Sequence, residues 1–417
     1  QLCGGHRGGQ SGRGHGLCGG IARRHAGTPC GHGALGLIQS RHGVFFRVFQ
    51  FQSVSERRSA NIEISVRRVA IIVMKAIAFY LPQFHVIPEN EAVYGQGFTE
   101  WSNVRSAKPL FKGHHQPRIP HNILGYYNLL DEKTLILQHY LAYSNGIHGF
   151  CYYYYNMAGR RLLEKPLDII NASRDINNDF CLCWDHNSWY DNTRTERDIP
   201  FIQQIYSVEN AKGIIQDLEQ YFSNPRYIKI DGKPLFLVFA PERCPGIEMY
   251  AETWREEASR LGFPGVYLAG VEAFIGCPPS MFGFDCMVEY APNWRTENMV
   301  CGMENPPRRL DYRETVKFML AKQVPDYPEM RCVFPDWDNT PRRGKNGIAT
   351  VNVSPEVFRI ALEGMADFTR RFVPDSLQYL FINAWNEWGE GCHLEPDQRY
   401  GFTYLNIVNE VMKQYGG

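Results

Sequence analysis

The sequence predicts a single (β/α)8 barrel over residues 74–417, and three observations favour it. Eight short, almost continuous apolar runs recur along the chain, which is typical of parallel strands buried on both faces. Segments with helical spacing separate most of these runs, as expected for a sheet covered by helices. The chain has 417 residues, which is enough for a barrel of about 250 residues with insertions.

The strands and helices can be placed along the chain from these patterns. The predicted strands are Lys75–Leu81, Gly149–Tyr155, Phe180–Trp184, Pro234–Ala240, Gly265–Val271, Asp285–Tyr290, Arg331–Phe334 and Gln378–Trp385. The predicted helices are Asp131–Ser144, Leu162–Ser173, Val208–Phe222, Ile247–Leu261, Asp311–Lys322, Pro355–Phe372 and Leu405–Tyr415. In Pro355–Phe372 an apolar face is expected to contain Val357, Ile360, Ala361, Gly364, Met365 and Phe368. The connection over residues 86–130 shows no clear element, and connections of this length tend to be functional.

Residues 1–73 differ from the rest of the chain. The first 50 residues contain 14 glycines, and the first acidic residue is Glu56. A composition so poor in periodic apolar residues predicts a disordered or non-native leader, with the barrel starting at Met74. Two alternatives are an arginine/glycine arm for nucleic acid and a metal site formed by Cys3, Cys18, Cys30 and the five histidines through His42, although the spacings match no zinc pattern.

Composition excludes several classes of function. The 44 basic and 44 acidic residues balance, which argues against binding to nucleic acid or a membrane surface through bulk charge. The sequence contains no run of 18 apolar residues, so we expect no membrane span. The 12 cysteines form no CxxC pair, which favours reduced thiols and a cytoplasmic location. The aromatic content of 13% fits either a ligand cleft or a well-filled core.

Polar and aromatic residues follow most of the predicted strands. In a barrel of this class the active site lies at the carboxyl ends of the strands, so these residues are the candidates for function. In chain order they are Gln83, Phe84, His85, Asp185, His186, Asn187, Trp189, Glu242, Glu272, Glu289, Tyr290, Asp336, Trp337, Asp338, Asn339, Glu387 and Glu390.

The stretch Phe381–Asp397 has the strongest chemical signal. It leaves an apolar strand and enters a glycine-containing turn with Glu387 and Glu390 three residues apart. Two carboxyl groups held close in a partly dry site have their pKa values driven apart, so that one serves as an acid and the other as a base. The neighbouring Trp385 and Trp388 favour a sugar-binding cleft, because sugar faces stack on aromatic rings. The alternative is a solvated acidic loop.

Six segments in sequence order resemble one family. They are FYLPQFH (residues 79–85), GFTEW (97–101), FCYYYY (150–155), FCLCW (180–184), WDNTPRR (337–343) and AWNEWGEGCHLEPD (384–397). Together they resemble the WbsX-type glycosyltransferase family of bacterial surface-polysaccharide loci, over residues 75–415. That family is similar to the endo-α-mannosidases of glycoside hydrolase family 99.

The resemblance implies a mechanism with two acids. Glu387 would draw a proton from the substrate 2-hydroxyl, and Glu390 would protonate the leaving oxygen and later activate water. The reaction would retain configuration through an epoxide-like sugar intermediate. The expected substrate contacts are His85, Glu100, Trp101, Tyr154, Trp184, Asp185, Trp189, Trp337, Asn386 and Trp388. One departure is Asn187, which stands where the family often carries an acid.

The resulting hypothesis is a carbohydrate-active enzyme of bacterial O-antigen or capsule metabolism. It would act on an oligosaccharide or polysaccharide, without cofactor or nucleic acid. A metal is not expected, because the adjacent residues His114 and His115 rarely aim at one ion and no carboxylate stands at helical spacing from them. One alternative is a nucleotide-sugar-dependent glycosyltransferase that uses the D-x-D sequence Asp336–Asp338, a weak signal because a D-x-D arises readily by chance. Another is a non-catalytic glycan-binding barrel.

Overall fold

The computed structural model describes residues 73–416 except 192–198, 275, 294–299 and 302–305. The described residues belong to one compact unit, Val69–Gly417. The expected leader, residues 1–73, therefore lies outside the described part apart from Val73. Within the described ranges, every helix is too short or too polar to cross a membrane.

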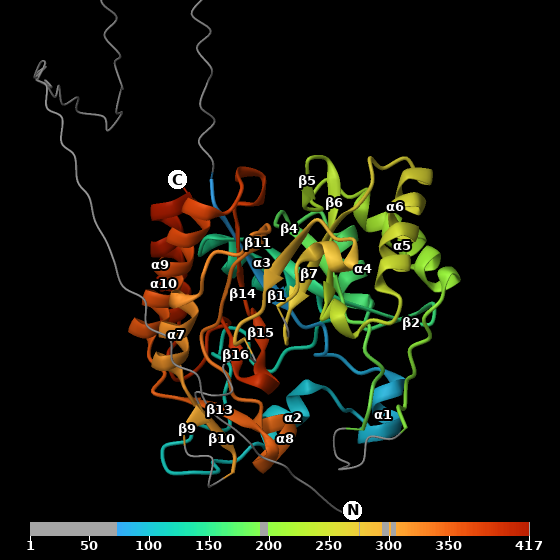
Figure 1. The fold of residues 1–417 in the computed structure, drawn as a ribbon. Helices are drawn as coiled ribbons and strands as arrows, with labels where there is room; N and C mark the ends of the chain where they lie inside the picture. Colours follow the sequence, from blue (N-terminus) through green and yellow to red (C-terminus); the bar gives the residue numbers. More distant parts are fainter. Residues whose placement is uncertain (1–72, 192–198, 275, 294–299, 302–305, 417) are drawn as a thin grey trace, which may run out of the picture. The chain divides into compact units, whose positions relative to one another are not determined.

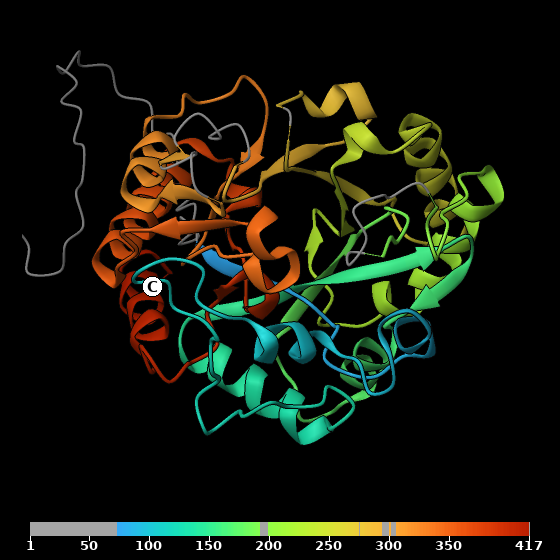
Figure 2. The same ribbon diagram turned by 90° about the horizontal axis from the view of Figure 1, so that it is seen from below.

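Nine parallel strands form the central sheet, in the order β11-β8-β7-β6-β4-β2-β1-β14-β12. Figure 2 shows the sheet end-on, curled into a ring inside a layer of helices. The strands are β1 (Lys75–Tyr80), β2 (Ile147–Met157), β4 (Asp179–Trp184), β6 (Lys233–Phe239), β7 (Tyr267–Glu272), β8 (Cys286–Glu289), β11 (Glu329–Met330), β12 (Cys332–Val333) and β14 (Tyr379–Ile382).

The two ends of this sheet meet in one interrupted strand. Arg331 separates β11 from β12, and β11 pairs with β8 while β12 pairs with β14. The Arg331 carbonyl still accepts a hydrogen bond from the Phe381 amide, at 2.8 Å. The two short strands thus occupy the seventh position and nearly close the ring, which confirms the predicted (β/α)8 barrel.

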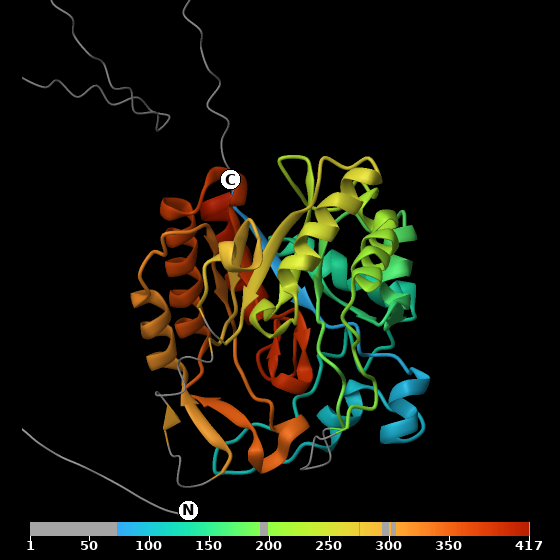
Figure 3. The ribbon, with the colours of Figure 1, turned by 45° about the vertical axis from the view of Figure 1, so that its right-hand side comes forward.

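Helices cover the outside of the barrel, as Figures 1 and 3 show, and the described residues contribute seven of them. They are α3 (Glu132–Ser144), α4 (Lys165–Ala172), α5 (Val208–Phe222), α6 (Ile247–Arg260), α7 (Tyr312–Ala321), α9 (Pro355–Phe372) and α10 (Thr403–Gly416). The connection from β7 to β8 contains a short 3-10 turn, Pro279–Phe282, in place of a helix. The inward face of α9 is rotated from the expected one, because Phe358 and Leu362 are buried whereas Ile360 is 54% exposed.

Further elements gather at the carboxyl ends of the strands, below the barrel in Figure 1. They are α1 (Pro88–Tyr94), α2 (Glu100–Ser106), α8 (Thr340–Arg343), β9 (Val300–Cys301), β10 (Arg308–Asp311), β13 (Ile348–Val351), β15 (Asn386–Glu387) and β16 (Cys392–His393). Two short strands elsewhere, β3 (Arg160–Leu162) and β5 (Lys229–Ile230), pair with β2 and β6. The connection over residues 86–130 thus contains α1 and α2, each of seven residues, too short for helical periodicity to reveal.

Candidate active site

A cavity of about 540 Å³ opens at the carboxyl end of the barrel. Tyr153 and Tyr155 reach it from β2, and Asp185 and Trp189 from the segment after β4. The other residues that line it are Leu81, Gln83, Asn90, Tyr94, Phe98, Glu100, Asn103, Asn187, Ser188, Tyr190, Phe201, Phe239, Tyr290, Pro341, Arg342, Arg343, Glu387 and Glu390. Aromatic rings beside carboxylates and amides suit a sugar, which presents both apolar faces and hydroxyl groups.

The turn that carries Glu387 and Glu390 is held from both sides. Strands β15 and β16 pair across it, with Glu387 opposite Cys392. At its start the Asn386 side chain binds the end of β1, accepting from the Leu81 amide at 2.7 Å and donating to the Leu81 carbonyl at 3.0 Å. The turn is therefore fixed to the barrel although 305 residues separate the two partners.

Arg342 of α8 binds three glutamates at once. Its Nη2 lies 2.9 Å from Glu387 Oε2, and its Nη1 lies 2.9 Å from Glu390 Oε1. Its Nε lies 2.7 Å from Glu100 Oε1 on α2. The planar guanidinium group can donate in several fixed directions, which a lysine cannot do. Arg342 thus sets the positions of both predicted catalytic acids.

Arg342 contacts all three carboxyl groups, and Arg343 acts on Glu390 from nearby, so the carboxyl groups outnumber the cations at the site. Burial raises the pKa of Glu387 to about 8, and the nearby Glu390 and Glu100 raise it while Arg342 opposes them. Burial also raises the pKa of Glu390. For Arg342, burial lowers the pKa, but the three carboxylates outweigh this and hold it well above its usual value. The group therefore retains at least one proton near neutral pH, as acid–base catalysis requires.

Gly389 is required by close approach rather than by flexibility. A Cβ atom at this position would lie 1.8 Å from Glu100 Oε1 and 2.8 Å from Arg342 Nε. Such distances are far shorter than any allowed contact, so a side chain here would displace the ion pair. The next residues complete the turn, with Gly391 in the left-handed region at φ +61°.

Another buried carboxyl group, that of Glu395, holds the turn through hydrogen bonds. Glu395 Oε2 accepts hydrogen bonds from Trp388 Nε1 at 2.6 Å and from the Tyr127 hydroxyl at 2.8 Å. Its Oε1 accepts one from Gln138 Nε2 at 2.6 Å. Burial raises the pKa of Glu395 to about 7. These contacts hold Trp388, which lies between the two acids in sequence, inside the protein.

Five of the twelve predicted site residues line the cavity. They are Glu100, Asp185, Trp189, Glu387 and Glu390. The other seven lie outside its lining; they are His85, Trp101, Tyr154, Trp184, Trp337, Asn386 and Trp388.

The positions of these seven have local physical reasons. Successive side chains of a strand point to opposite faces, so Tyr153 and Tyr155 face the cavity while the Tyr154 hydroxyl donates to Asp217 of α5 at 2.7 Å. Trp184 likewise faces the helix layer and packs edge-on against Trp254 of α6. Trp101 Nε1 donates to a backbone carbonyl, and Asn386 and Trp388 brace the turn. His85 and Trp337 are also buried.

Several lining residues were not anticipated from sequence, above all Arg342, Tyr153 and Tyr155, whereas Tyr290 was among the candidates at the strand ends. Arg342 lies within the WDNTPRR segment, which marks the region as part of the family pattern but does not indicate which residues Arg342 contacts. If the inward face of β2 had been known, the alternation of side chains along a strand would have identified Tyr153 and Tyr155 as lining residues.

Asn187, where the sequence departs from the family's usual acid, lines the cavity beside Asp185. Its Nδ2 donates to Asp185 Oδ1 at 2.6 Å. A neutral amide at this position thus binds a carboxylate that an acid here would repel.

The D-x-D aspartates lie at a different cavity, and protein donors reach all four of their oxygens. Asp336 Oδ1 accepts from the Trp337 amide, and Oδ2 accepts from Arg118 Nη2, both at 2.7 Å. Asp338 Oδ1 accepts from the Thr340 hydroxyl at 2.6 Å. Its Oδ2 lies 2.7 Å from His114 Nε2 and accepts from Gln116 Nε2 at 2.6 Å. In the described part of the chain, no group of three His, Cys, Asp or Glu side chains has the geometry of a metal site.

Comparisons with known proteins agree with this fold. The chain is 37% identical over 342 residues to the uncharacterized protein WxcX of Xanthomonas campestris pv. campestris, strain ATCC 33913. This match covers 81% of the chain and 49% of WxcX, so the chain spans about half the length of the curated relatives it matches.

Solved structures of carbohydrate-active enzymes share the barrel. One is the GH99 endo-alpha-mannosidase from Bacteroides thetaiotaomicron, at 14% identity and a TM-score of 0.53, covering 82% of this chain and 97% of that one. Another is a glycoside hydrolase-like protein, at 13% identity and a TM-score of 0.51, covering 82% and 94%. At such identities the likeness shows the fold.

The family itself is identified by sequence. The family model described as Glycosyltransferase WbsX matches residues 76–408, which span the barrel from β1 into α10. The chain therefore belongs to the WbsX glycosyltransferase family.

Proposed function

We propose that this protein breaks or transfers an α-linked glycosidic bond, such as a mannoside, in a bacterial surface polysaccharide. The observation that carries the proposal is the contact of Arg342 with Glu100, Glu387 and Glu390 in a cavity lined with aromatic rings. Buried carboxyl groups with raised pKa values are typical of catalytic acids and bases. The likeness to an endo-alpha-mannosidase fold supports the substrate class.

In the proposed reaction the two acids act on different oxygens of the sugar whose C1–O bond breaks. Glu387 takes the proton of the 2-hydroxyl, whose oxygen attacks C1, while Glu390 gives its proton to the oxygen that leaves C1. Water or a sugar hydroxyl then attacks C1, Glu390 takes its proton, and the Glu387 proton returns to O2. Both inversions at C1 together retain configuration. Arg342 favours the ionised form of Glu387 needed for the first step.

A second candidate is transfer from a nucleotide-sugar, which the family's name favours. The hydrogen bonds that engage all four oxygens of Asp336 and Asp338 support the first proposal over a metal-dependent one. Transfer between glycans needs no such ion. Activity that survives chelation on a glycan donor would favour the first candidate, and activity that requires both a metal and a nucleotide-sugar would favour the second.

The two acids can be tested by substitution with the near-isosteric amide. Glu387→Gln, Glu390→Gln and the double variant are assayed on α-linked mannosides, alongside Glu363→Gln on the outer helix α9 as a control. We expect each site variant to lose at least a hundredfold in turnover, and the two losses not to add, because the residues act as a unit. Near-normal turnover in either variant would contradict the mechanism, provided that unfolding curves show an intact fold.

A further inference from the structure

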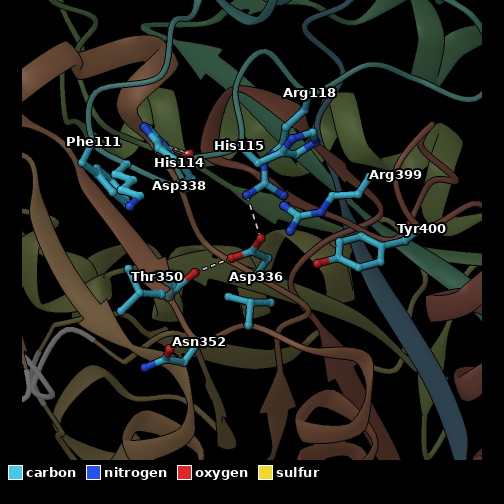
Figure 4. A pocket seen from close by; sticks show the side chains of 14 residues that line it. Phe111, His114, His115, Arg118, Asp336, Asp338, Thr350, Asn352, Arg399 and Tyr400 are labelled. Atoms are coloured by element: carbon cyan, nitrogen blue, oxygen red, sulfur yellow. Dashed lines mark hydrogen bonds and ion pairs between the residues drawn. The ribbon is translucent and has the colours of Figure 1, made fainter.

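A second cavity, of about 240 Å³, lies beyond the catalytic turn. Its walls come from the segment before Arg118, from β13 and from the residues around Arg399, as Figure 4 shows. The turn separates the two cavities. Glu390 lines the first, whereas a Cβ atom on Gly391 would lie 2.9 Å from Arg118 and from Asp338, which line the second.

The acids of this second cavity are already engaged by protein donors. Asp336 pairs with Arg118 at 2.7 Å, and Asp338 pairs with His114 at 2.7 Å. Burial opposes ionisation of Asp338, but hydrogen bonds and charge from His114 and Arg118 outweigh it and lower its pKa. Both aspartates therefore serve to hold the basic side chains, rather than to receive a cation.

The basic side chains that line the cavity outnumber the two aspartates that line it, and Asp397 acts on His115 and Arg118 from nearby. Arg118, Arg399, Lys112 and His115 all line the cavity, and within the described ranges neither Lys112 nor Arg399 forms an ion pair. Burial lowers the pKa of His115, and the charges of Arg399 and Arg118 lower it further, while Asp397 and Asp336 oppose them. Figure 4 shows the three side chains converging above Asp336.

We propose that this cavity binds an oxyanion, a carboxylate or a phosphate, held by Arg399, His115 and Arg118. Guanidinium groups suit such ligands because their donors match the two oxygens of a carboxylate or phosphate. At about 30 Å³ for each water, the cavity has the volume of about eight waters, which is room for phosphate or one charged sugar unit. Tyr400 also lines the cavity, and its ring lies under the Arg399 guanidinium, 4.9 Å from ring centroid to Cζ, which helps to fix that arginine at the site.

The cavity is also connected to the catalytic turn. The Asp338 amide donates a hydrogen bond to the Glu390 carbonyl, so a residue that lines this cavity also holds the turn that carries Glu390. Assigning the anion to a charged unit of the glycan rests on the proposed function. The presence of the anion site does not, because binding can be measured without turnover.

Calorimetric titration of the full chain with two probes, inorganic phosphate and glucuronate, tests the site, with glucose as the neutral control. We expect saturable binding of at least one anion, weakened at least tenfold in Arg399→Ala and partly restored in Arg399→Lys. Binding should be unchanged in Arg359→Ala, where an arginine is removed from α9. Tighter binding of glucuronate would indicate an acidic sugar, and binding of phosphate alone would indicate free or esterified phosphate.

Two results would overturn the proposal: no saturable binding of either anion, or equal affinity in Arg399→Ala. The catalytic variant Glu387→Gln distinguishes this proposal from the proposed function. If it binds the anion normally while the wild type has no glycosidic activity, the proposed function fails and the anion site stands. If the wild type has glycosidic activity and no anion binds, the anion site fails and the proposed function stands.

Discussion

Replacing Arg342 with alanine leaves Glu100, Glu387 and Glu390 without their shared cation. In the native protein the side chains of these glutamates are 4%, 6% and 19% exposed, so water replaces the lost contacts poorly. The expected consequence is a loss of stability that depends on pH, because a buried carboxyl group can avoid an unpaired charge by taking up a proton.

The magnitude follows from the three contacts. A hydrogen bond to a charged group contributes about 1.5–3 kcal/mol, and three bonds to one side chain do not add fully. Removing one partner of a buried ion pair costs about 3–5 kcal/mol, which we expect at pH 8.5. At pH 5 Glu387 of the variant is protonated, because its pKa lies well above 5, so the loss in the free energy of unfolding should be smaller.

The sign of this dependence is fixed by the direction of the pKa shift. Glu387 has a folded-state pKa of about 8, above its unfolded value, so its contribution is fully present at low pH and is lost as pH rises through 8. Without Arg342 this pKa rises further, so the stability of the variant falls more steeply with pH than that of the wild type.

Denaturant unfolding at pH 5 and pH 8.5 measures the effect. The control is Arg359→Ala, whose arginine forms exposed ion pairs with Glu363 and Glu410 on the outer helices; such pairs contribute at most about 1 kcal/mol. An equal loss at both pH values in Arg342→Ala would refute the reasoning, because it would mean that Arg342 stabilises by packing. Arg342→Lys should restore part of the stability, since one ammonium cannot reach three acceptors.

Three further outcomes are expected. Turnover should rise with pH toward about 8 as the base Glu387 loses its proton; a flat profile from pH 5 to pH 9 would contradict the acid–base pair. Gly389→Ala should reduce kcat at least a hundredfold by displacing the ion pair, and normal kcat would show that the turn can yield. Glu395→Gln should lower the free energy of unfolding by about 1–3 kcal/mol, because the new amide NH2 would face groups that donate hydrogen bonds to Glu395, such as Trp388 Nε1. An unchanged unfolding curve would contradict this.

The fold could be predicted from sequence because its signal is local. An apolar run such as Lys75–Leu81 identifies a buried strand without knowledge of its neighbours. The helix bounds of α5 and α9 were predicted to the residue, Val208–Phe222 and Pro355–Phe372. The rotation that exposes Ile360 could not be predicted, since the packing of α9 against α7 and α10 determines it.

The site was predictable only in part because its geometry depends on distant contacts. Glu387 and Glu390 are recognisable by their spacing. Their ion-pair network is not, because Arg342 lies 45 residues from Glu387 in sequence and 242 residues from Glu100. The aromatic residues show the same limit. Tyr154 and Tyr155 are chemically identical neighbours, and the register of β2 decides that one binds Asp217 and the other lines the cavity.

The carboxyl groups in the cavity outnumber the basic groups, so their mutual repulsion must be opposed by the hydrogen bonds that fix the turn. Two unit charges 4 Å apart interact by about 1 kcal/mol in water and about 4 kcal/mol at an effective dielectric constant of 20. The same three glutamates on the surface would therefore ionise almost independently and could not divide into an acid and a base. Burial creates the difference, and the resulting repulsion acts to push the turn outward. The bonds from Asn386 to Leu81 and from Trp388 to Glu395 oppose that movement. Weakening either one should therefore lower the pKa of Glu387 as well as the stability, since the turn would relax toward water.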